Sequence, residues 1–71
     1  MALSFRQFDK AMEYFRKGCT IEFYDDGGLI ERMDYDSRYN QLISCFALCT
    51  RIIVTDKDGS VIRDCYPKTA F

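Results

Sequence analysis

Apolar and polar positions divide the chain into two similar halves. In each half a Cys-Thr pair leads into an apolar run, which is followed by an Asp-Gly turn and a short apolar pair that ends in isoleucine. These segments are residues 19–30 and 49–62. Because two apolar runs joined by Asp-Gly favour a β-hairpin, the pattern predicts two hairpins and resembles a loose internal repeat.

The first predicted hairpin joins strands 20–24 and 29–33 through Asp25-Asp26-Gly27-Gly28. The second joins strands 50–55 and 60–65 through Asp56-Lys57-Asp58-Gly59. The repeat is explained about equally well by duplication and by convergence on residues that suit hairpin turns.

An N-terminal helix precedes the first hairpin. Ser4 and Gln7 have the spacing of a capping box, and Leu3 can pack on Phe8 as a hydrophobic staple. Gly18 is suited to the left-handed conformation that ends many helices. Apolar residues at helical spacing give this helix one face that needs a cover, for which a sheet is the simplest candidate: Phe5, Phe8, Met12 and Phe15.

The segment between the hairpins, residues 36–48, fits two structures. As a helix it begins at a cap, Asp36 or Ser37, and carries a stripe of Tyr39, Leu42, Phe46 and Cys49. As a strand its side chains alternate between two faces, with Leu42, Ser44, Phe46 and Leu48 on one of them. The helix is favoured. We therefore predict a single small α+β domain over residues 1–71, in which the N-terminal helix packs on an antiparallel sheet of about four strands.

Composition indicates a folded chain without an export signal. The 71 residues are 48% hydrophobic and 30% charged, with a net charge of −1, which is typical of a soluble globular surface. Residues 1–10 do not form a signal peptide, and no apolar run approaches the ~20 residues of a membrane helix. We expect a cytoplasmic protein with no membrane association, whose four cysteines are reduced thiols.

No motif for catalysis or cofactor binding stands out. The chain has no histidine to activate a cysteine or serine, and its cysteines lack the close pairs that are typical of zinc sites. The segment from Asp56 resembles a calcium loop at its start, but Val61 occupies the place of the required glycine. The aspartates of the predicted turns do not indicate a catalytic carboxylate pair, because turn aspartates usually bond their own backbone. We expect neither an enzyme nor a bound cofactor or metal.

The charge is unevenly distributed along the chain. Residues 19–36 contain six acidic residues and one basic residue, Arg32, so this segment has a charge of −5. Residues 1–18 carry a charge of +2. Such asymmetry can steer association with a partner of opposite charge.

The sequence therefore favours a small protein-interaction module, regulatory or inhibitory, that presents an acidic hairpin to a protein partner. A partner with a positively charged surface would complement this hairpin. The expected contact residues are Glu22, Tyr24, Asp25, Asp26, Asp34, Tyr35, Asp36 and Tyr39. We also expect a homodimer, formed through a sheet edge or the helix stripe.

A nucleic-acid-binding domain is the alternative. It would use the sheet for base stacking, or a basic helix face formed by Arg6, Lys10, Arg16 and Lys17. The net charge of −1 makes nucleic acid the less favoured partner.

Overall fold

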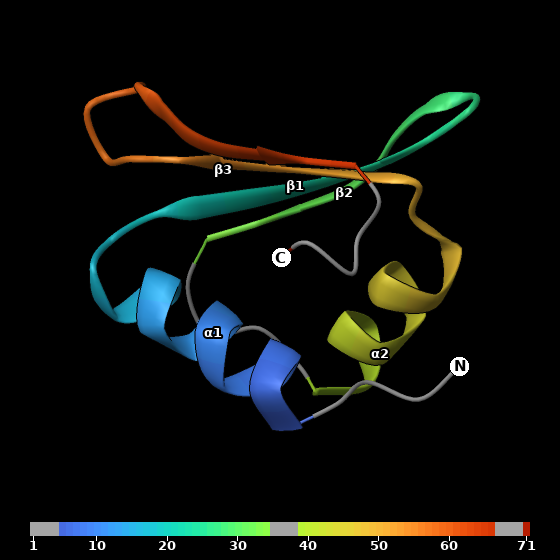
Figure 1. The fold of residues 1–71 in the computed structure, drawn as a ribbon, viewed down its shortest axis with the longest axis horizontal. Coiled ribbons are helices and arrows are strands. Elements are labelled where there is room, and N and C mark those ends of the chain that lie inside the picture. Colours follow the sequence, from blue (N-terminus) through green and yellow to red (C-terminus); the bar gives the residue numbers. More distant parts are fainter. Residues whose placement is uncertain (1–4, 35–38, 67–70) are drawn as a thin grey trace.

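The computed structural model of the chain describes residues 5–34, 39–66 and 71. Its elements are α1 (Phe5–Arg16), β1 (Thr20–Asp25), β2 (Gly28–Met33), α2 (Tyr39–Leu48), β3 (Arg51–Thr55) and β4 (Val61–Cys65). The four strands form one antiparallel sheet in the order β2-β1-β3-β4. Both helices lie on the same side of this sheet (Figure 1). The predicted α+β fold, with two hairpins and a second helix between them, is confirmed.

Helix α1 ends where the sequence predicts. Gly18 adopts a φ of 84°, and the amides of Gly18 and Cys19 donate to the carbonyls of Phe15 and Tyr14 at 3.0 Å each. This paired bonding satisfies the last helical carbonyls and requires the left-handed residue that glycine supplies. The cap at Ser4 and the staple from Leu3 lie outside the described residues.

The buried face of α1 is wider than the predicted stripe. Phe15 is buried, but Phe8 and Met12 are only partly buried, and Ala11 and Tyr14 complete the contact with the core. The side chain of Phe5 lies outside the described residues.

The strand boundaries differ from the prediction by one residue at four ends. β1 extends to Asp25 and β2 begins at Gly28, whereas β3 begins at Arg51 rather than Thr50, and β4 at Val61 rather than Ser60. The amide of Thr50 still donates to the carbonyl of Tyr24 at 2.7 Å, so the ladder begins one residue before the strand.

The segment between the hairpins is the helix α2, which begins at Tyr39. Four residues at helical spacing are buried: Leu42, Cys45, Phe46 and Cys49. The proposed caps at Asp36 and Ser37 lie outside the described residues, as does the side chain of Tyr39. The helical interpretation of this segment is confirmed, and the alternating strand is wrong.

The two halves form equivalent αββ units around an approximate two-fold axis that runs between β1 and β3. An offset of 31 residues relates five pairs of buried positions in the helices and in β1 and β3, namely Ala11 with Leu42, Tyr14 with Cys45, Phe15 with Phe46, Ile21 with Ile52 and Phe23 with Val54. The offset also relates the irregular points of the hairpins, which fall between Phe23 and Tyr24 in one and Val54 and Thr55 in the other.

The repeat alignment suggested by the sequence is therefore wrong by one residue. Matching Cys19 to Cys49 sets the buried Ile21 against Arg51, which lies on the opposite face of the sheet. Because side chains alternate along a strand, the burial pattern excludes that register. The match of Ile21 to Ile52 keeps both on the buried face.

The core lies between the sheet and the two helices. Phe23 on β1 packs edge-on against Phe46 of α2, with ring centroids 5.1 Å apart. Phe71 joins the same cluster, at 5.3 Å from Phe46 and 5.7 Å from Tyr14. One aromatic layer thus connects both helices to the centre of the sheet.

Candidate functional site

The sheet has one face that neither helix covers, which we call the outer face. Strand alternation turns the buried Ile21, Phe23, Ile52 and Val54 toward the helices and their neighbours away from them. The paired registers then place the following residues on the outer face: Thr20, Glu22, Tyr24, Leu29, Arg32, Arg51, Ile53, Thr55, Val61 and Asp64. Leu29 and Val61 are 53% and 61% exposed, so this face presents apolar as well as charged groups.

Glu22 is the centre of one polar cluster on the outer face. The hydroxyl of Tyr24 donates to its Oε1 at 3.1 Å, and the Nε of Arg32 lies 3.5 Å from its Oε2. The hydrogen bond to the carboxylate raises the pKa of Tyr24. The same hydrogen bond fixes the position of the Tyr24 hydroxyl over Glu22.

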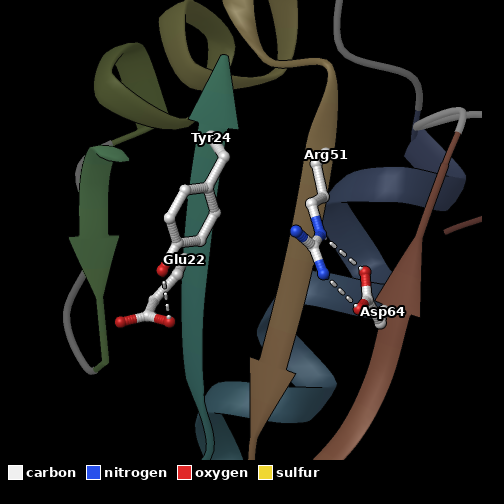
Figure 2. A network of polar contacts seen from close by, with 4 residues as sticks. All are labelled: Glu22, Tyr24, Arg51 and Asp64. Carbon is white, nitrogen blue, oxygen red and sulfur yellow. Dashed lines mark hydrogen bonds and ion pairs between the residues drawn. The ribbon is translucent and has the colours of Figure 1, made fainter. Parts of the chain in front are cut away.

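Arg51 and Asp64 form a second cluster, from the neighbouring strands β3 and β4 (Figure 2). The guanidinium donates through Nε and one terminal nitrogen to the two carboxylate oxygens, at 3.0 and 2.7 Å. This bidentate bond lowers the pKa of Asp64 and raises the pKa of Arg51. The same guanidinium lies 5.1 Å from the ring centroid of Tyr66, which is 63% exposed.

The turn between β1 and β2 carries two exposed carboxylates, Asp25 and Asp26, which we call the acidic tip. The Oδ1 of Asp25 accepts the amide of Gly27 at 2.8 Å, and Gly28 has a φ of 119°. Asp25 is thus part of the turn itself, whereas the Asp26 side chain is available to solvent. In Figure 1 the tip extends at one end of the sheet, away from the opposite β3–β4 turn.

The predicted contact residues do not form one continuous acidic surface. Glu22 and Tyr24 lie together on the outer face, and Asp25 and Asp26 follow them at the tip. Asp34 lies at the far end of β2, because its neighbour Met33 pairs with Ile21 near the start of β1. Tyr35 and Asp36 lie outside the described residues, as does the side chain of Tyr39.

Glu31, another acidic residue of the first hairpin, lies on the face of the sheet opposite to Glu22. Its carboxylate accepts the side-chain amide of Gln41 in α2 at 2.8 Å, on the helix side of the sheet. Sequence reasoning also missed Arg51, Asp64 and Tyr66. Only strand pairing brings Arg51 beside Tyr24, and Asp64 and Tyr66 beside Arg51.

The basic residues of α1 are individually engaged or dispersed. Lys17 pairs with Glu13 at 3.4 Å, and the Nζ of Lys10 lies 5.5 Å from the ring centroid of Tyr14. Arg6 and Arg16 are exposed. No helix among the described residues has the length and apolar character to cross a membrane.

The four cysteines are free thiols and all are buried. In the described part of the chain, no three histidine, cysteine, aspartate or glutamate side chains cluster closely enough to hold a metal ion. Burial, together with the nearby charge of Glu31, raises the pKa of Cys45 to about 11. A thiol with such a pKa is a packing group rather than a nucleophile at neutral pH.

Cys45 is therefore expected to resist alkylation in the folded protein. Since a pKa of about 11 replaces an ordinary value of 9.0, the thiolate fraction at neutral pH falls about a hundredfold. Mass mapping of iodoacetamide adducts measures the rate of Cys45 alkylation in the folded protein in buffer and in the unfolded protein in urea. A native rate equal to the rate in urea would contradict this environment for Cys45.

Comparison with protein-family models, with curated proteins and with solved structures found no match to this chain.

Proposed function

We propose that this protein is a non-enzymatic binding module that presents its acidic tip to a basic region of a protein partner, in a regulatory or inhibitory role. The observation that carries the proposal is the exposure of Asp25 and Asp26 on a turn with a defined conformation. An ordered turn loses little conformational freedom on binding, which favours affinity.

The charges around the tip support this proposal. Arg32 and Arg51, the cations on the adjacent outer face, are already paired with Glu22 and Asp64. Among the described residues no cation lies within ion-pair distance of either tip carboxylate. The tip therefore keeps its negative charge available for a positively charged partner.

The β3–β4 turn offers a matched comparison within the same protein. It also contains an aspartate next to a glycine, but Lys57 lies between Asp56 and Asp58. Asp56 has the structural role of Asp25, because its Oδ1 accepts the amide of Asp58 at 3.2 Å. Asp58, like Asp26, is exposed and follows the aspartate that accepts the turn bond.

Asp26→Lys is the sharpest test, since it reverses a charge and spares the turn bond of Asp25. A partner isolated from the native cell should associate with this variant roughly three- to tenfold more slowly than with the wild type at low salt. Stopped-flow or surface-plasmon kinetics with the purified partner measures the rates. Unfolding curves of wild type and variant should coincide.

Asp58→Lys is the matched control and should change the association rate little. Equal losses from Asp26→Lys and Asp58→Lys would show that general charge, not the acidic tip, determines binding. Unchanged association of Asp26→Lys at low salt, where steering is strongest, would place the partner site elsewhere.

Nucleic-acid binding is a second candidate, which the outer face favours in one respect. Tyr24 and Tyr66 flank Arg51 there, and such groups can stack on bases. Glu22 and Asp64 on the same face oppose phosphate binding. Retention on a nucleic-acid column that fades with salt, and that Asp26→Lys strengthens, would support this candidate over the protein partner.

A further inference from the structure

The outer face has a row of three charged side chains and one isoleucine at its middle. The registers align Arg32 with Glu22, Glu22 with Ile53, and Ile53 with Asp64, so these residues form a line across all four strands. A cation stands at the β2 end of the line and an anion at the β4 end. Opposite charges therefore occupy the two edges of the same face, each beside its partner within the chain, Arg32 beside Glu22 and Asp64 beside Arg51.

A parallel row lies next to the acidic tip. Tyr24 pairs with Leu29 on one side and Arg51 on the other, and Arg51 in turn lies against Tyr66. This row is apolar at the β2 end and aromatic at the β4 end, with a tyrosine and an arginine between. The two ends of each row thus carry complementary groups, Arg32 and Asp64 in the first and Leu29 and Tyr66 in the second, whereas Glu22 and Ile53 occupy the middle of the first row.

We infer that the outer face binds a second copy of this chain, through a two-fold axis parallel to the strands. Such an axis brings β2 of each copy over β4 of the other and keeps every residue in its own row. Arg32 then faces Asp64 of the second copy, and Asp64 faces Arg32. The resulting pair of sheets, packed face to face, is a common arrangement, in which strands cross at about 30°.

The neighbouring row is also self-complementary under this axis. Leu29 meets the ring of Tyr66 in the second copy, and Tyr24 meets Arg51. The first contact covers two of the most exposed apolar side chains, at 53% and 63% exposure. The second adds a cation against an aromatic ring.

The charges disfavour the other aligned packing of the two faces, in which the two-fold axis runs perpendicular to the strands. An axis perpendicular to the strands would place each strand over its own copy, so that Arg32 faces Arg32 and Asp64 faces Asp64. Like charges in direct opposition weaken an interface and reject that orientation. The distribution of charge on the face therefore favours the axis parallel to the strands over the perpendicular one.

The small area of the face argues for a weak dimer. Four strands about 4.8 Å apart and five residues at about 3.3 Å each give a face of roughly 19 by 17 Å. A standard interface buries about 800 Å² on each partner, which is a large share of the 4738 Å² surface of this chain. The face is smaller than that standard, so dissociation is expected in the micromolar range.

The dimer places both acidic tips at the same end of the assembly. An axis parallel to the strands preserves position along them, and each tip directly follows the row of Tyr24 and Leu29. Two tips on one side suit a partner with two basic regions, and simultaneous binding raises avidity without new contacts. This consequence rests on the proposed function, whereas the dimer itself does not.

Sedimentation of two charge-reversed variants and their mixture tests the dimer. Arg32→Glu and Asp64→Lys should each weaken self-association about tenfold or more, because both create like-charge contacts across the axis. An equimolar mixture should recover the wild-type affinity, because both contacts of the mixed dimer pair opposite charges: the new glutamate with the new lysine, and the native Asp64 with the native Arg32. Arg16→Glu, an exposed reversal on α1, should leave self-association unchanged.

Circular dichroism melting shows whether each variant keeps its fold. Should Asp64→Lys unfold because Arg51 loses its partner, Arg32→Glu carries the test alone, at a side chain that is 68% exposed. A wild type that sediments as a single 8.3 kDa species up to high micromolar concentration would overturn the inference. So would a folded Arg32→Glu with unchanged self-association, or a mixture of folded variants that does not recover. Asp26→Lys should sediment as the wild type does, which separates failure of the dimer from failure of the tip.

Discussion

Phe23→Ala is expected to lower the free energy of unfolding by about 3–5 kcal/mol. Phe23 has no exposed surface, and its ring packs on Phe46 at the centre of the aromatic layer. A domain of this size has only a few kcal/mol of net stability. The variant should therefore be largely unfolded, which far-ultraviolet circular dichroism and urea titration at about 25 °C would measure.

Phe8→Ala is the comparison for this result. Phe8 is only partly buried against the core, so its truncation should cost clearly less than truncation of Phe23. A wild-type urea midpoint for Phe23→Ala would contradict the packing of β1 against the helices. Equal destabilisation by both variants would show that α1 packs more deeply than its exposure indicates.

Much of the fold could be predicted because local signals agree with tertiary packing. Gly18 ends α1 in the left-handed conformation, and Gly28 and Gly59 occupy turns with φ of 119° and 91°. These positions follow from glycine's freedom at positive φ. The strand ends differ by one residue, since hydrogen bonds to a neighbouring strand, invisible in the local sequence, set where a ladder begins.

The alignment of the repeat is wrong for a related reason. Residue identity suggests that Cys19 corresponds to Cys49, but strand equivalence is decided by which side chains face the helices. Ile21 and Ile52 share that role. The flanking Cys-Thr pairs do not, because Cys19 directly precedes its strand and Cys49 is followed by one further residue, Thr50.

The outer face could not be assembled from the sequence. Tyr24 and Asp25 are identified by local composition, but Arg51 and Asp64 lie far from them along the chain. Only the antiparallel pairing of β1 with β3, and of β3 with β4, places these side chains on one surface. Strand order is a non-local property, so the charge run from residue 19 to 36 is more continuous in sequence than it is in space.

The second large effect on stability is expected in the segment between the hairpins, for which the sequence allowed a helix or a strand. In the alternating strand considered for residues 36–48, Leu42 and Leu48 share a face and would be buried equally. In α2 the six-residue spacing leaves their side chains about 120° apart around the helix axis. Leu42 accordingly has no exposed surface, whereas Leu48 is 64% exposed.

Leu42→Ala should therefore lower the free energy of unfolding by about 2–5 kcal/mol, through lost burial and the cavity left beneath α2. Leu48→Ala removes the same atoms from a solvent-exposed position and should change stability by no more than about 0.5 kcal/mol. Urea titrations of the two variants under identical conditions measure the difference. Similar losses from both would contradict the helical placement of this segment, because only a helix separates the environments of two leucines six residues apart in this way.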